Sequence, residues 1–420
     1  MQPASRTTTA VVILGVLFFL FGFVTWVNGP LMSYLKLACE LEGPVVMFLV
    51  TFAFYIAYFV TALPMSWVMQ RTGLRRGMML GLFIMAAGAL LFIPAAQSRA
   101  YPLFLVGLFT IGAGLSMLQT ASNPYITVVG PIESAAARIS IMGICNKAAG
   151  MLAPYIVGFL LLGDASTIEQ ELGTLTGAAK EARLAELASR VVVPYLSMAI
   201  ALIALGVGIR FAPLPELEVE KDEASVMGDG RSLWSHTNLM LGVVALFLYV
   251  GVEVLAGDSI GPYGTALGIP LDQAKLFTSY TLAAMIVGYV IGILCIPRFI
   301  SQSQALLASA ALGIVLTLAA IALPGYSSVL CIALLGLANA LMWPAIWPLA
   351  VQGLGKHLKT GSALLIMGIA GGAILPLVYG WLGARPAIGL QQAYWIMVPC
   401  YGFIGWYALW AQRRKPLGQR

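Results

Sequence analysis

Three ionisable side chains stand inside long apolar stretches of this sequence: Lys147, Glu253 and Asp258. Lys147 lies in "MGICNKAAG" (142–150), and the two acids lie five residues apart in "GVEVLAGDSIGP" (251–262). A charged group in an apolar environment is costly unless it is paired, so such residues are candidates for function by default. An ammonium can donate hydrogen bonds to hydroxyl groups or to a carboxylate, and a carboxylate can hold a cation.

Neutral polar side chains in the same apolar stretches complete a candidate site. Amides offer a donor and an acceptor side by side, which suits the vicinal hydroxyls of a sugar, and an indole face can pack on the C–H face of a pyranose. In "ANALMWPAIWP" (338–348), Asn339, Trp343 and Trp347 follow one another at spacings of four, although Trp347 is more typical of a structural interface residue. The candidate binding residues are Asn28, Gln119, Asn123, Asn146, Lys147, Glu253, Asn339 and Trp343.

The composition shows what kind of protein must position these residues. Of the 420 residues, 60% are hydrophobic and only 10% are charged, and the mean hydropathy is +0.92. Soluble domains carry about 25% charged residues, so this composition indicates an all-α protein that crosses a lipid bilayer many times. Five scattered cysteines and two histidines in connecting segments form no metal or disulfide pattern. We expect neither an enzyme nor a nucleic-acid-binding protein, and we expect a monomer without an organic cofactor.

Apolar runs of about 20 residues predict membrane-spanning helices, and twelve such runs are present. If both termini lie in the cytoplasm, fifteen lysines and arginines face inward and seven face outward, which agrees with the positive-inside rule. The net charge of +6 reflects mainly this bias. The predicted spans are 10–36, 45–70, 76–97, 101–129, 136–162, 191–212, 238–264, 272–297, 303–323, 327–353, 358–383 and 391–411.

An internal repeat divides the chain into two six-helix halves. The stretch "IMGICNKAAGMLAP" (141–154) resembles "IMGIAGGAILP" (366–376). The predicted parts are an N-terminal half (1–212), a cytoplasmic linker (213–237) and a C-terminal half (238–420). Two parallel six-helix halves are the architecture of major facilitator transporters, whose substrate site lies at the bilayer midplane between them.

Two local predictions concern connections and breaks. Residues 163–190, rich in Ala, Glu and Leu, are expected to form a short amphipathic helix on the outer side. Glycines and Pro262 in the seventh span predict a broken helix there, whose unwound carbonyls would face a cavity.

Five stretches carry a resemblance to a known family: "FLFGFVTWVNGPLMSYLK" (19–36), "VTFAFYIAYFV" (50–60), "LFLVGLFTIGAGLSMLQTASNPYITVVGP" (103–131), "LYVGVEVLAGDSIGPYG" (248–264) and "LIMGIAGGAILPL" (365–377). The sequence resembles the fucose permease family of major facilitator sugar symporters, in its bacterial glucose/galactose transporter branch. The resemblance implies uptake of a monosaccharide across a bacterial inner membrane, coupled to a cation. The alternatives are a proton symporter for N-acetylglucosamine or another sugar and, with less support, an exporter of drugs or metabolites.

Two departures from the family bear on the coupling ion. Fucose permeases carry an acid directly after the first-span asparagine and another before the "TAxNP" run, and this sequence has Gly29 and Gln119 there. We therefore expect sodium coupling in preference to proton coupling. Asp258, with nearby carbonyls, is the candidate sodium ligand, and Glu253 and Lys147 are further candidates for coupling. Two plainer alternatives remain open: Lys147 as a structural ammonium that only packs the spans together, and Asp258 as an acid at the outer interface.

Overall fold

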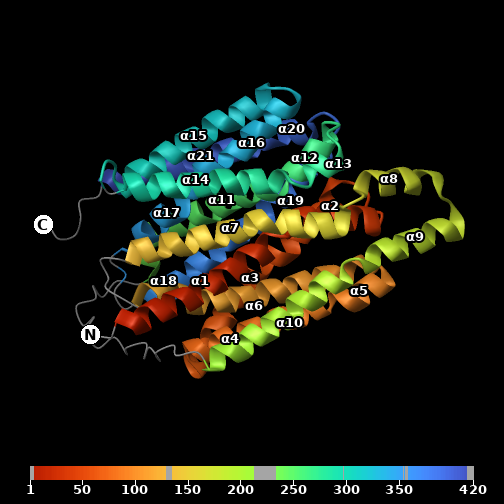
Figure 1. The fold of residues 1–420 in the computed structure, drawn as a ribbon. Coiled ribbons are helices and arrows are strands. Elements are labelled where there is room, and N and C mark those ends of the chain that lie inside the picture. The colour runs from red at the N-terminus through yellow and green to blue at the C-terminus, as the bar shows by residue number, and fades with distance from the viewer. Residues whose placement is uncertain are drawn as a thin grey trace, which may run out of the picture.

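The computed structural model describes residues 4–128, 135–211, 233–296, 298–352, 354 and 358–413. Nearly all of these residues are helical, and eleven of their helical stretches are long and apolar enough to cross a membrane. The twelfth predicted span corresponds to α21 (Met397–Arg413), which is shorter, at 17 residues. Figure 1 shows the long helices lying side by side along one direction, with both termini at one end and α8 and α9 at the other. The all-α, multi-span architecture predicted from composition is confirmed.

The N-terminal half comprises ten helices of the described chain. The spans are α1 (Ala4–Trp26) with α2 (Asn28–Ala38), α3 (Pro44–Thr72), α4 (Leu74–Leu90) with α5 (Phe92–Ser98), α6 (Tyr101–Val128), α7 (Ala135–Leu162) and α10 (Val192–Phe211). The stretch expected as one amphipathic helix forms two, α8 (Ala165–Thr174) and α9 (Gly177–Ser189). Most of the predicted linker lies outside the described residues.

The C-terminal half begins with a 3-10 turn, η2 (Leu233–Ser235), and repeats the pattern. Its helices are α11 (Thr237–Asp258), α12 (Ile260–Ala266), α13 (Leu271–Ala274), α14 (Phe277–Cys295), α15 (Gln302–Ala322), α16 (Gly325–Ala340), α17 (Met342–Val351), α18 (Leu358–Met367), α19 (Gly371–Gly383), α20 (Gly389–Ala393) and α21. Short 3-10 turns, η4 (Gly368–Ala370) and η5 (Tyr394–Ile396), interrupt the eleventh and twelfth spans.

The first and seventh spans are interrupted at matching places. The breaks fall at Val27 and at Ser259, and one residue separates each from the Gly-Pro pair that follows, at 29–30 and 261–262. Proline has no N–H to donate to the carbonyl four residues earlier, so one helical hydrogen bond is missing at each place.

The seventh-span break is smaller than the sequence predicted. Ser259 keeps helical dihedrals, and its N–H still donates to the Leu255 carbonyl. The expectation of an unwound segment is therefore wrong: α11 is regular up to its last residue, Asp258, and its glycines serve close packing.

Small residues allow the helices to approach closely. A Cβ on Gly22 would lie 1.8 Å from the Asn146 carbonyl oxygen, and one on Gly371 would lie 1.7 Å from the Phe247 carbonyl oxygen. These contacts join α1 to α7 in one half and α11 to α19 in the other, so the two halves use the same device. In a bilayer the hydrophobic effect does not drive apolar helices together, because the lipid tails are equally apolar. Van der Waals contacts between closely packed helices contribute the attraction, and small residues allow that close approach.

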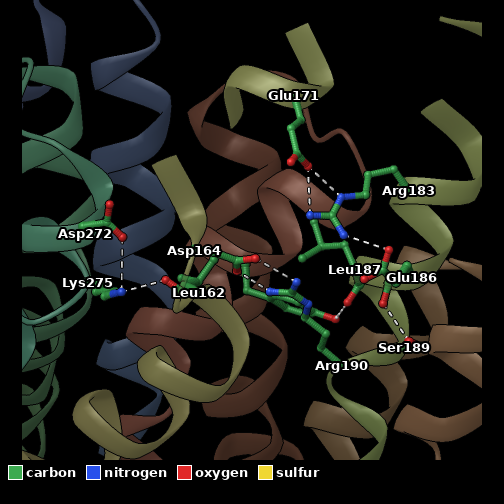
Figure 2. A network of polar contacts seen from close by, with 11 residues as sticks. Leu162, Asp164, Glu171, Arg183, Glu186, Leu187, Ser189, Arg190, Asp272 and Lys275 are labelled. Carbon is green, nitrogen blue, oxygen red and sulfur yellow. Dashed lines mark hydrogen bonds and ion pairs between the residues drawn. The ribbon is translucent and has the colours of Figure 1, made fainter. Parts of the chain in front are cut away.

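Polar contacts between the two halves run from the middle of the molecule toward the end that carries α8 and α9. At that end, Lys275 Nζ donates to the Leu162 carbonyl over 2.6 Å, as Figure 2 shows, and Ser279 Oγ donates to the Met151 carbonyl over 2.7 Å. Phe48 of α3 packs edge-on against Tyr379 of α19, with ring centroids 5.5 Å apart. In the part of the chain that the structure describes, the two halves are therefore closed together at this end.

Candidate functional site

An ion pair joins the two halves at the centre of the molecule. Lys147 of α7 donates to Glu253 of α11, with 2.6 Å between Nζ and Oε1. Only 11% of the lysine side chain and 8% of the glutamate side chain are exposed. Burial makes an unpaired charge expensive, so each group depends on the other. The sequence singled out both residues as candidates, and the structure places them in contact.

Trp26 supports this pair and was not singled out from the sequence. The Lys147 ammonium lies 4.6 Å from the centroid of the Trp26 ring, so the cation has a carboxylate on one side and an aromatic ring on another. The indole is 1% exposed, and its N–H has no hydrogen-bond partner among the described residues. A signal was present in the sequence, because Trp26 directly precedes the "VNGP" break (27–30).

Asp258 is completely buried, which excludes the reading that it is an acid at the outer interface. Thr51 of α3 donates to Asp258 Oδ2 over 3.1 Å, so this contact also crosses between the halves. Within the described part of the chain, Asp258 Oδ1 has no hydrogen-bond partner. An ionised carboxylate without a cationic partner is unfavourable in such a place, so the site favours a bound cation or a proton.

Oxygen atoms of several types gather around Asp258. A Cβ on Gly29 would lie 3.6 Å from Asp258 Oδ1 and 2.7 Å from Thr278 Oγ1, so both oxygens lie beside the backbone of residue 29. Thr278 in turn donates to the Gly257 carbonyl over 2.7 Å. A carboxylate, hydroxyls and a carbonyl are the ligands that hard cations prefer. No cluster of three or more His, Cys, Asp or Glu side chains occurs in the described residues, so a transition-metal centre is not indicated there.

The predicted amide residues fall into two groups. Gln119 and Asn28 lie in the N-terminal half: Gln119 Nε2 donates to the Tyr58 hydroxyl over 3.2 Å, and Asn28 Nδ2 is buried with no partner among the described residues. Asn339 is completely buried, and its Oδ1 accepts a hydrogen bond from the Tyr401 hydroxyl over 2.9 Å. Its Nδ2, like that of Asn28, has no hydrogen-bond partner among the described residues. These amides retain donors for a ligand.

Two other predicted amides do not join this group. Asn146 donates to the Phe18 carbonyl over 3.3 Å and so holds α7 against α1, although it adjoins Lys147 in sequence. The side chain of Asn123 lies outside the described residues.

The expected stripe of Asn339, Trp343 and Trp347 is divided by a break in the tenth span. Leu341 separates α16 from α17, so Asn339 lies on one helix and both tryptophans on the next. The two indoles stack with centroids 5.4 Å apart, and Trp343 also packs against Tyr249 at 6.4 Å. Tyr249 lies on α11, four residues before Glu253, so Trp343 packs against the same helix that carries the acid of the central pair.

A separate charged network covers the end that carries α8 and α9 (Figure 2). Arg190 binds both carboxylate oxygens of Asp164, at 2.5 and 3.0 Å, and Arg183 pairs with Glu171 and Glu186. The hydrogen bond from Arg190 lowers the pKa of Asp164 below its ordinary value. These pairs are half-exposed and hold the α8–α9 segment together, so they form no part of the buried site.

Comparison with known proteins places this architecture in a family. A model of the Major Facilitator Superfamily matches residues 14–375. A protein of Brucella abortus named glucose/galactose transporter is 35% identical over 400 residues, which cover 94% of this chain and 92% of the relative. The L-fucose-proton symporter of Escherichia coli is 28% identical over 363 residues, covering 85% of this chain and 82% of the relative.

A solved structure has the same fold. The crystal structure of the major facilitator transporter FucP in the outward conformation superposes with a TM-score of 0.75 at 25% identity, covering 97% of this chain and 100% of that one. The chain therefore belongs to the major facilitator superfamily, within its fucose permease family of sugar transporters, and it is a membrane transporter and not an enzyme.

Proposed function

We propose that this protein takes up a hexose of the glucose/galactose type by symport with a cation. The observation that carries the proposal is the buried Lys147–Glu253 pair between the halves, five residues along α11 from a second buried acid. The charged pair and the nearby amides offer hydrogen bonds to a polar substrate, which favours a sugar over an apolar compound. The names of the 35% identical relative and of the fucose symporters support a sugar as the substrate.

The proposed sugar contacts come from both halves. Asn28, Gln119 and Lys147 supply donors from the N-terminal half, and Glu253, Asn339 and Trp343 supply an acceptor, a donor and an aromatic face from the C-terminal half. The buried Nδ2 atoms of Asn28 and Asn339 have no partner among the described residues, and a sugar hydroxyl would satisfy each of them. Asn123 remains a candidate from the sequence alone.

Asp258 is the proposed site of the coupling ion. Its unpaired Oδ1, the Thr51 and Thr278 hydroxyls and the Gly257 carbonyl support sodium as the first choice. Gly29, at the place where fucose permeases carry an acid, lies against this carboxylate. Proton coupling is the alternative, because relatives of this chain are named proton symporters, and a proton would also neutralise Asp258.

Transport would proceed by alternating access between the two halves. The halves meet at the α8–α9 end, which faces outward if both termini are cytoplasmic. Opening that end pulls α7 away from α11, so the Lys147–Glu253 pair would separate and free its ammonium and carboxylate for the sugar. We further propose a monomer in a bacterial inner membrane.

The test is uptake of labelled sugars into proteoliposomes with independently imposed sodium and pH gradients. We expect concentrative uptake of glucose or galactose driven by an inward sodium gradient at equal pH on both sides. Uptake driven equally well by a pH gradient without sodium assigns the proton as the coupling ion. Uptake of fucose or N-acetylglucosamine in place of glucose and galactose replaces the proposed substrate, and absence of uptake and counterflow for all four sugars refutes sugar transport.

A further inference from the structure

Trp26 is the last residue of α1, and its ring lies between the two halves of the protein. The indole is 1% exposed and packs in one apolar cluster with Leu282, Met285 and Tyr289 of α14 and Ala340 of α16. A residue of the N-terminal half thus packs at the interface against the core of the C-terminal half.

Glycines on both sides leave room for this ring. A Cβ on Gly150 of α7 would lie 2.4 Å from Trp26 Cδ1, and a Cβ on Gly257 of α11 would lie 2.2 Å from Cζ3. Both distances are far below van der Waals contact, so any side chain at either position would displace the indole. The pyrrole edge therefore rests on one half and the benzene edge on the other.

The same ring touches both parts of the proposed transport site. The Lys147 ammonium lies 4.6 Å from the ring centroid while it holds Glu253 at 2.6 Å. The benzene edge rests on Gly257, the residue directly before Asp258, whose carbonyl accepts from Thr278. A cation over a tryptophan face is attracted most strongly where water is excluded, as it is here.

We propose that Trp26 is a positioning residue that links the ion site at Asp258 to the Lys147–Glu253 pair. The inference rests on the proposed cation symport and adds a residue whose indole N–H, among the described residues, donates to neither carboxylate. A shift of the α11 backbone at Gly257, as the ion binds or leaves, moves the ring, and the ring moves the ammonium that it holds. The ring thereby determines how firmly Lys147 stays on Glu253 when the ion site is empty.

The test compares Trp26→Phe and Trp26→Leu with the wild type in proteoliposomes. The readouts are the cation concentration at half-maximal uptake and the sugar affinity in counterflow, each per folded molecule. We expect the half-maximal cation concentration to change at least about fivefold in Trp26→Leu and less in Trp26→Phe, which keeps an aromatic face. Gly257→Ala, which displaces the ring without altering any charged group, should change it in the same direction as Trp26→Leu.

A matched control is Trp381→Leu. Arg385 lies 3.6 Å over the Trp381 ring, but this ring is 50% exposed at the α8–α9 end, so we expect no change in cation dependence. Unchanged cation dependence in both Trp26→Leu and Gly257→Ala overturns the inference. So does a lower yield of folded protein if the molecules that do fold respond normally to the cation. Asp258→Asn tests the ion site separately from the role of Trp26. Normal cation activation in Asp258→Asn refutes the ion site itself. If Asp258→Asn loses cation activation but the Trp26 variants keep a normal cation dependence, only the role of Trp26 is refuted.

Discussion

The Lys147–Glu253 pair predicts a specific pattern of stabilities in a double-mutant cycle. Removing one partner leaves the other charge in a place where 8–11% of the side chain is exposed. Removal of one partner of a buried ion pair typically destabilises a protein by about 3–5 kcal/mol. The destabilisation is smaller where the remaining group becomes neutral by gaining or losing a proton. We therefore expect Lys147→Met and Glu253→Gln each to unfold at clearly lower denaturant concentration than the wild type.

The double variant should recover most of this loss, because it leaves no unpaired charge in the core. Replacing both members of a buried pair by neutral groups is often close to neutral for stability, so the coupling energy should be about 2 kcal/mol or more. The assay is unfolding of the four purified proteins in mixed micelles, together with sugar uptake by each of them in proteoliposomes.

An exposed pair of the same chemistry serves as the control. Lys180 and Glu40 also lie 2.6 Å apart, but 36% and 43% of their side chains are exposed, so their coupling should be at most about 1 kcal/mol. Additive effects at Lys147 and Glu253, within about 0.5 kcal/mol, would mean that the pair does not form in the populated state. A stable double variant with normal uptake would instead make the pair a packing feature only.

Three further predictions concern separate parts of the molecule. Gln119→Ala should weaken sugar binding by about 1–3 kcal/mol through a lost hydrogen bond while the protein stays folded, and unchanged affinity in counterflow would remove Gln119 from the site. Asp258→Asn should abolish or sharply reduce cation activation of uptake, because the amide keeps the shape and loses the charge; normal sodium activation would assign the ion to another residue, with Glu253 the next candidate. At the α8–α9 end, the lowered pKa of Asp164 means that its pair with Arg190 contributes stability above the ordinary aspartate pKa and loses it as pH falls through the lowered value. Melting temperatures should therefore differ between wild type and Asp164→Asn near neutral pH, by the equivalent of about 1 kcal/mol or less, and converge as pH falls through the lowered pKa of Asp164; a difference that grows on acidification contradicts the assignment.

Charged members of the site could be found from the sequence, because a lysine or an acid within an apolar span is conspicuous. Lys147, Glu253 and Asp258 were found in this way. The twelve-span, two-half architecture was equally accessible, because span length and charge bias are local properties of the chain.

Neutral partners of those charges could not be found in the same way. Thr51 and Trp26 look like ordinary residues of apolar helices, and their roles arise from helices far apart in sequence that meet only in the folded protein. For the same reason, sequence reasoning overvalued Asn146, whose amide is used by a neighbouring backbone carbonyl. A polar side chain in a span shows that it needs a partner, but not which partner it has.

The two matching breaks explain how a symmetric backbone carries an asymmetric site. Trp26 and Asp258 are 232 residues apart, and each directly precedes the break that comes before a Gly-Pro pair. From these equivalent positions an aromatic ring of one half and a carboxylate of the other lie at the interface, where the ring rests on Gly257 beside that carboxylate. The lysine lies in one half and both acids lie in the other, so the distance between the charges depends on how the halves are placed. Any movement that separates the halves must break these contacts, and ligands that replace them can therefore control the movement.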